Sequence, residues 1–77
     1  MLAIKVITRD KNYIDFEISG DRQNLYRYIK GENSFKKLFG VGKNNFGKAI
    51  RGNARNKINQ LVKIVFENNL PFGMIEA

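Results

Sequence analysis

Residues 2–18 read LAIKVITRDKNYIDFEI and alternate between apolar and polar side chains in two runs. The apolar side chains of each run fall on one side, with Leu2, Ile4 and Val6 in the first run and Ile14, Phe16 and Ile18 in the second. A period of two residues is that of a β-strand with one buried face. The residues between the runs, Arg9–Asn12, include Asp and Asn, which favour turns. We therefore predict an antiparallel hairpin with one apolar and one largely solvated face.

The next two segments are predicted to be helical. Asp21 is a good N-cap residue for a helix over Arg22–Lys30, and Gly31 is placed to end it. The apolar residues on one side of that helix are Leu25, Tyr28 and Ile29. Ser34 then favours a single helical turn around Phe35–Phe39, with a stop at Gly40.

The clearest helical pattern covers Asn44–Asn68. Its apolar residues recur at spacings of three and four: Phe46, Ile50, Ala54, Ile58, Leu61, Val62 and Val65. Gly52 interrupts the pattern and Asn53 is a natural cap, so one kinked helix or two helices meeting at a turn would satisfy it, and two are favoured. The sequence ahead of Pro71 ends the helix, and Phe72–Glu76 suits a short third strand or a tail packed on the sheet.

These patterns predict one α+β domain over residues 1–77, with an N-terminal antiparallel hairpin, two to four helices and a short C-terminal third strand. The chain has no cysteine or histidine, so disulfides and the usual zinc sites are excluded, and the fold must rest on its apolar core or on self-association. Nothing approaches the roughly 20 apolar residues of a membrane span, and the N-terminus lacks a signal-peptide pattern. We expect a cytoplasmic protein.

The charge of the chain is concentrated in its middle. Residues 22–63 hold eleven Lys or Arg and one acid, Glu32, whereas the whole chain carries a net charge of +7. Such crowding is destabilising, and a polyanionic partner is the ordinary reason for it. The alternative is codon bias, because Phe, Tyr, Met, Ile, Asn and Lys make up 39 of the 77 residues, as in an AT-rich genome such as that of a phage.

A basic stripe along the last predicted helix is the main candidate site. At 100° per residue its members lie along one edge of the helix: Lys48, Arg51, Arg55, Asn59 and Lys63. They are predicted to contact phosphates, with Lys36, Lys37 and Lys43 adding charge from the preceding segment. Tyr26 lies off the apolar side of the first predicted helix, and we expect it to be an exposed ring able to stack on a base. The alternative for the stripe is an ordinary solvated helix face.

Residues Gly42–Ala49 nearly match the phosphate-binding loop of nucleotide hydrolases. The pattern requires Ser or Thr where Ala49 stands, so the hydroxyl that holds Mg²⁺ is missing. Backbone N–H groups at a helix start, between Lys43 and Lys48, can still hold one phosphate of a polymer. This segment therefore favours phosphate binding without hydrolysis.

Catalysis has little support in the sequence. Without histidine or cysteine, acid–base work would fall to carboxylates, lysines or tyrosines. Asp15 and Glu17 share a strand face that we expect to be solvated, which leaves nothing to raise their pKa values. We expect no enzyme, no cofactor and no bound metal.

The sequence thus predicts a regulatory nucleic-acid-binding protein that contacts phosphates through a basic helical surface. RNA is slightly favoured over DNA, because dispersed cations and aromatics suit RNA better than a defined major-groove helix does. Residues Ala54–Lys63 as the reading helix of a helix-turn-helix remain the DNA-binding variant. The alternative class is a small protein-binding inhibitor or regulator, acting through an acidic partner such as a nucleic-acid enzyme or a defence factor of a phage host.

Overall fold

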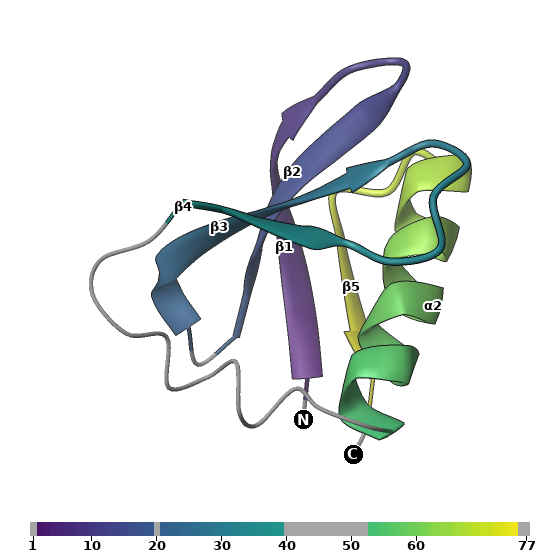
Figure 1. Ribbon diagram of the computed structural model, residues 1–77. Coiled ribbons are helices and arrows are strands. Elements are labelled where there is room, and N and C mark those ends of the chain that lie inside the picture. The colour runs from purple at the N-terminus through teal and green to yellow at the C-terminus, as the bar shows by residue number, and fades with distance from the viewer. Residues whose placement is uncertain (1, 20, 40–52, 76–77) are drawn as a thin grey trace.

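The protein is a five-stranded antiparallel sheet with a helix packed on one face, as a computed structural model describes it for residues 2–19, 21–39 and 53–75 (Figure 1). The elements in chain order are β1 (Leu2–Arg9), β2 (Tyr13–Ile18), β3 (Asp21–Ile29), β4 (Lys36–Phe39), α2 (Asn53–Glu67) and β5 (Phe72–Ile75). The strands lie in the order β4-β3-β2-β1-β5. The prediction of a hairpin followed by two to four helices is therefore wrong, because the sheet dominates and the described residues hold a single helix.

The N-terminal hairpin is confirmed. Strands β1 and β2 pair antiparallel, with Ile4 opposite Ile18 and an irregularity between Val6 and Thr8. The turn is closed by the Asp10 N–H, which donates to the Tyr13 carbonyl, and by the Asp10 carboxylate, which accepts from the Asn12 N–H. The predicted apolar side of β2 is fully buried, because β2 is the central strand and α2 packs over this side of it.

The two segments predicted as short helices are strands. Asp21 opens β3 opposite Ile18 and is no helix cap, and Gly31, with a φ of 87°, lies in the turn after β3. The segment predicted as a turn of helix at Phe35–Phe39 instead supplies β4, which pairs with β3. The inward-facing residues of β3 are Asn24, Tyr26 and Tyr28, a set that includes a polar residue and so hid the strand period.

Helix α2 confirms the second half of the predicted long helix. It starts at Asn53, and its end is fixed by Asn69, which adopts a left-handed φ of 58°. The N–H of Leu70 donates to the Val65 carbonyl, and the N–H of Asn69 donates to the Phe66 carbonyl. This pair of bonds is the Schellman arrangement, in which backbone bonds satisfy the last helical carbonyls. The predicted helical residues 44–52, with the turn at Gly52, lie outside the described residues.

The core lies between α2 and one face of the sheet. Ile58, Leu61, Val62 and Val65 of the helix pack on the buried apolar residues of the strands, which are Ile4, Ile14, Phe16, Ile18, Tyr26 and Tyr28. Phe35, from the turn between β3 and β4, completes the cluster. In Figure 1 this turn reaches across to α2, so the helix contacts both the sheet and the segment that leads into β4.

Strand β5 follows the predicted C-terminal strand and brings its backbone close to the helix. Gly73 lies opposite Ile4 in β1, and a Cβ atom at this position would lie 2.7 Å from both Leu61 Cδ1 and Val65 Cγ2. That separation is far below van der Waals contact. Only a residue without a side chain lets β5 and α2 pack this closely.

Substitution of Gly73 by alanine is expected to lower the free energy of unfolding by about 1–3 kcal/mol, because the added methyl group overpacks the interface between α2 and β5. Urea denaturation followed by circular dichroism measures the change. Met74→Ala, at the exposed neighbouring position, is the control and should cost within about 0.5 kcal/mol. Equal stability of Gly73→Ala and the wild type would contradict the packing described.

Candidate nucleic-acid interface

Two cationic segments that lie far apart in the sequence are joined at Phe35. The Phe35 N–H donates to Asn59 Oδ1 over 3.0 Å, and the Phe35 carbonyl accepts from Arg55 Nη2 over 2.9 Å. The same Arg55 nitrogen donates to Ser34 Oγ over 3.1 Å, and its guanidinium carbon lies 4.2 Å from the centre of the Phe35 ring. Helix α2 is thereby fixed to the residues immediately before β4.

This junction places Arg55 of the helix next to the residue that precedes Lys36 and Lys37 of β4. We call Lys36, Lys37, Arg55 and Lys63 the basic edge. Lys37 is opposite Tyr26, whose side chain faces the helix, whereas Lys36 is opposite Arg27 on the other face of the sheet. Lys63 is half-buried and lies one helical turn beyond Asn59.

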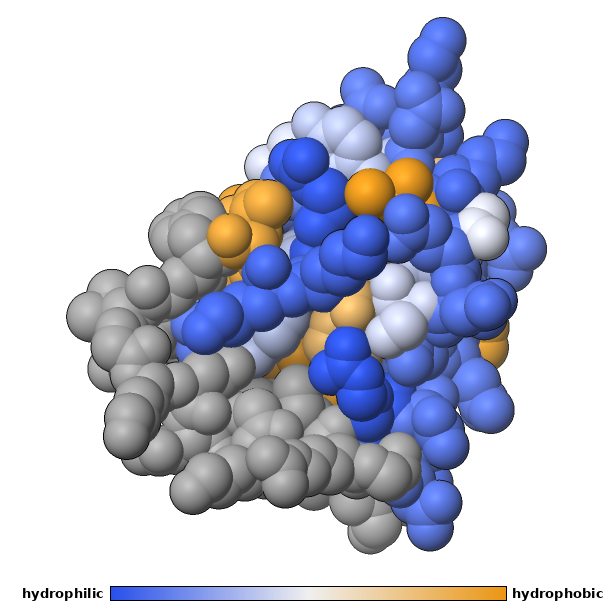
Figure 2. Space-filling view, viewed as in Figure 1, coloured by the Kyte–Doolittle hydropathy of each residue, from blue (hydrophilic) through white to orange (hydrophobic). Residues whose placement is uncertain are grey.

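The two lysines of β4 are available to an anion. The Lys36 side chain is 71% exposed, and its ammonium lies 3.5 Å from Glu32, in a surface pair of small energy. Lys37 is exposed as well. Figure 2, which looks onto β4 and α2, shows a predominantly hydrophilic surface over these elements. An arrangement of this kind can neutralise phosphates, and lysines on an edge strand also discourage pairing with another strand.

Of the nine residues predicted for the site, the structure brings Arg55 and Asn59 together at Phe35, the residue before Lys36 and Lys37. It places Lys36 and Lys37 on opposite faces of β4 and Lys63 one turn further along α2. It gives two of the nine a different role. Arg55 and Asn59 are engaged by the backbone of Phe35, so they hold α2 to the segment before β4. Lys43, Lys48 and Arg51, and the whole loop Gly42–Ala49, lie outside the described residues.

Tyr26 is not the exposed ring that the sequence predicted. It is 2% exposed and lies in the core, where its ring centre is 5.9 Å from that of Phe16 and 5.5 Å from that of Phe35. The prediction failed because Tyr26 was placed on a helix, and the strand period turns it inward instead. Tyr26 therefore supports the fold and cannot stack on a base from this position.

Asp15 also departs from its predicted solvated position. Its carboxylate is buried and accepts two bonds from Arg27, of 2.7 Å from Nε and 3.0 Å from Nη2. The Arg27 guanidinium lies 4.0 Å from the centre of the Tyr13 ring. The hydrogen bond from Arg27 to Asp15 raises the pKa of Arg27 above its ordinary value, so this side chain stays charged across the physiological range. The pair holds β2 to β3 and is not free for acid–base chemistry.

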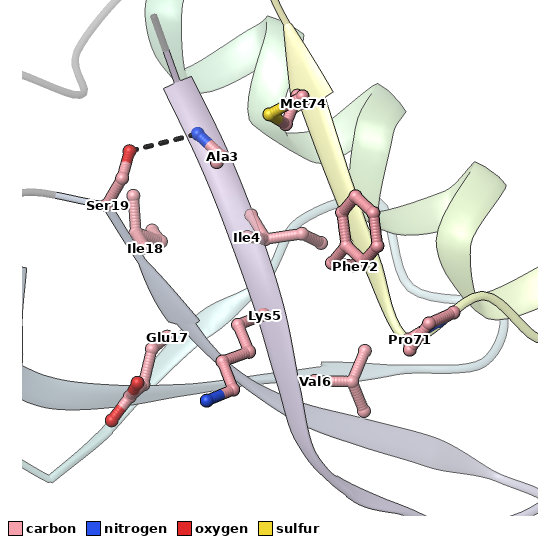
Figure 3. Close-up of a pocket in the computed structure, with 10 residues that line it drawn as sticks. All are labelled: Ala3, Ile4, Lys5, Val6, Glu17, Ile18, Ser19, Pro71, Phe72 and Met74. Carbon is pink, nitrogen blue, oxygen red and sulfur yellow. Dashed lines mark hydrogen bonds between the residues drawn. The ribbon is translucent and has the colours of Figure 1, made fainter.

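A second surface was missed by the sequence analysis. On the face of the sheet opposite α2, Phe72 and Met74 are 57% and 59% exposed. With Lys5 and Glu17 they line an open groove of about 640 Å³ across β5, β1 and β2 (Figure 3). The available signal was the alternation of large Phe72 and Met74 with small Gly73, which a strand places on one face.

Removal of the Asn59 side chain is expected to lower the free energy of unfolding by about 1–3 kcal/mol, since Asn59→Ala leaves the partly buried Phe35 N–H without its acceptor. Asn59→Asp keeps an acceptor oxygen and should retain most of the stability, while Gln60→Ala, at the exposed neighbouring position, should change it by about 0.5 kcal/mol at most. Chemical denaturation compares the three variants. If Asn59→Ala behaved like Gln60→Ala, the junction at Phe35 would not be supported.

Within the described residues, no group of three or more acidic side chains is gathered as a metal would require, and α2 is neither long nor apolar enough to cross a membrane. Comparison with protein-family models, with curated proteins and with solved structures finds no match for the chain.

Proposed function

We propose that the protein binds nucleic acid, RNA in preference to DNA, and contacts phosphates through the lysines of the basic edge. The observation that supports the proposal is the junction at Phe35, which fixes Arg55 of α2 to the segment that leads into Lys36 and Lys37 of β4, in a chain with a net charge of +7. Each phosphate that a lysine neutralises releases condensed counterions, and this release favours binding.

The preference for RNA follows from the contacts that already occupy the side chains of α2. Reading a DNA major groove requires a helix whose side chains are free to reach base edges. In α2, one side is occupied by the core, and the Arg55 and Asn59 side chains on the adjoining edge bond the segment before β4. These contacts argue against Ala54–Lys63 as a reading helix and favour binding through surface lysines.

Fluorescence anisotropy with labelled single-stranded RNA, duplex RNA and duplex DNA tests the proposal. We expect the tightest binding to RNA, with affinity that falls steeply between about 50 and 200 mM salt. Weak binding that is equal for all three polymers and insensitive to salt would contradict it.

A protein partner is the second candidate, and the exposed apolar side chains Phe72 and Met74 favour it. Such an interface would rest on a few aromatic or arginine contacts and would depend only weakly on salt. The same salt series therefore separates an inhibitor or regulator that binds an acidic protein from a nucleic-acid binder.

A further inference from the structure

We infer that the face of the sheet opposite α2 binds an unpaired nucleobase, which stacks on Phe72 as a single strand crosses from the basic edge. This inference rests on the proposed function and specifies single-stranded nucleic acid as the ligand. It starts from an unusual aromatic side chain. Phe16, Tyr26 and Phe35 are buried together, whereas Phe72 lies on an edge strand with more than half of its surface in water.

A lysine lies at each end of this face. Lys5 is directly opposite Phe72 in the pairing of β1 with β5, so a cation lies beside the ring. At the other side of the same face, the exposed Lys36 of β4 lies opposite Arg27 of β3, whose guanidinium is bound to Asp15. Four strand spacings of about 4.8 Å separate Phe72 on β5 from Lys36 on β4, roughly 19 Å across the sheet, a span within reach of a strand of a few nucleotides.

Glu17 settles which part of the ligand faces the groove. It is opposite Lys5 on β2, and Figure 3 shows its side chain on the same face as Lys5 and Phe72. A carboxylate repels phosphate but accepts hydrogen bonds from the N–H groups at base edges. The groove is thus suited to a base, with the phosphates of the strand lying toward Lys5 and the basic edge.

Stacking requires an unpaired base, and this gives a sharp test. We compare the affinities of a labelled 12-nucleotide RNA strand and of the same strand in a duplex for the wild type, Phe72→Ala and Phe72→Tyr. Phe72→Ala should weaken single-strand binding roughly 5- to 150-fold and leave duplex binding unchanged. Phe72→Tyr should retain single-strand binding. Ile64→Ala, at an exposed apolar position on α2, is the matched control and should have no effect.

The outcomes separate this inference from the proposed function. If Phe72→Ala bound the single strand as tightly as the wild type, or lost affinity for the duplex equally, the stacking site would be overturned. In that case, a loss of affinity for both ligands in Lys37→Ala/Lys63→Ala would still support phosphate binding by the basic edge. If the wild type bound neither ligand, both proposals would fail, and the exposed ring would then be assigned to a protein contact. Melting temperatures within a few degrees of the wild type would show that each variant is folded.

Discussion

Replacement of Phe35 by alanine is expected to remove about 3–5 kcal/mol of stability and to leave much of the protein unfolded at moderate temperature. The ring is 1% exposed although it lies outside the regular elements. Its centre is 5.7 Å from that of Phe16 and 5.5 Å from that of Tyr26, so its removal opens a cavity in the middle of the core. At roughly 0.05–0.15 kcal/mol per residue, a domain of this size has only about 4–12 kcal/mol to lose.

The loss should exceed that of an ordinary core cavity because the Phe35 ring also supports Arg55. The guanidinium that lies over the ring would lose this contact, and the junction between α2 and β4 would loosen. Urea denaturation of Phe35→Ala measures the effect, with Leu38→Ala as a control at an exposed position of β4, where we expect a change within about 0.5 kcal/mol. A change of similar size in both variants would contradict a core centred on Phe35.

The second large effect is expected on binding. Lys37→Ala/Lys63→Ala removes two lysines of the basic edge, and the loss of two phosphate contacts should weaken RNA binding roughly 25- to 60-fold at about 0.1 M salt. The matched control is Lys11→Ala/Lys57→Ala, which lowers the net charge from +7 by the same two units. Both control positions are exposed, Lys11 in the turn between β1 and β2 and Lys57 roughly 200° around α2 from Arg55.

The comparison distinguishes a localised site from general attraction. We expect the control variant to bind within a fewfold of the wild type, since distant charges contribute only through a screened field. Equal losses in the two variants would assign the binding to net charge alone, including charge that reflects codon usage. Anisotropy titrations with one RNA strand under identical conditions provide the measurement.

The sequence predicted the parts of the fold whose signals are local. The hairpin is determined by the alternation of apolar and polar residues and by a turn with Asp and Asn. Helix α2 is determined by its apolar stripe and by Asn69, which ends it. Strand β3 was missed because Leu25, Tyr28 and Ile29 fit helical spacing, while its true inward set includes the buried polar Asn24. Whether a side chain faces the core depends on whether a helical or a strand period is assumed, so the same error placed Tyr26 at the surface.

The site could be predicted only in part, because its geometry depends on contacts distant in sequence. The concentration of lysines and arginines identified the basic residues, but the 24-residue separation of Phe35 and Asn59 left no local sign of their hydrogen bond. Asp15 was judged as an isolated carboxylate because its partner, Arg27, was expected on a helix. Residues 72–76 were expected to suit a strand, but the exposure of the Phe72 ring depends on the pairing of this strand with β1, which is distant in sequence.

The most direct test of phosphate binding by the basic edge is the slope of log K against log salt concentration for single-stranded RNA, measured between about 50 and 200 mM salt for the wild type and the two double-lysine variants. We predict that Lys37→Ala/Lys63→Ala reduces the magnitude of the slope by about 1.4–1.8, because two fewer phosphates are neutralised, and that Lys11→Ala/Lys57→Ala leaves the slope of the wild type unchanged. Parallel lines for all three proteins would contradict the assignment of phosphate contacts to the basic edge.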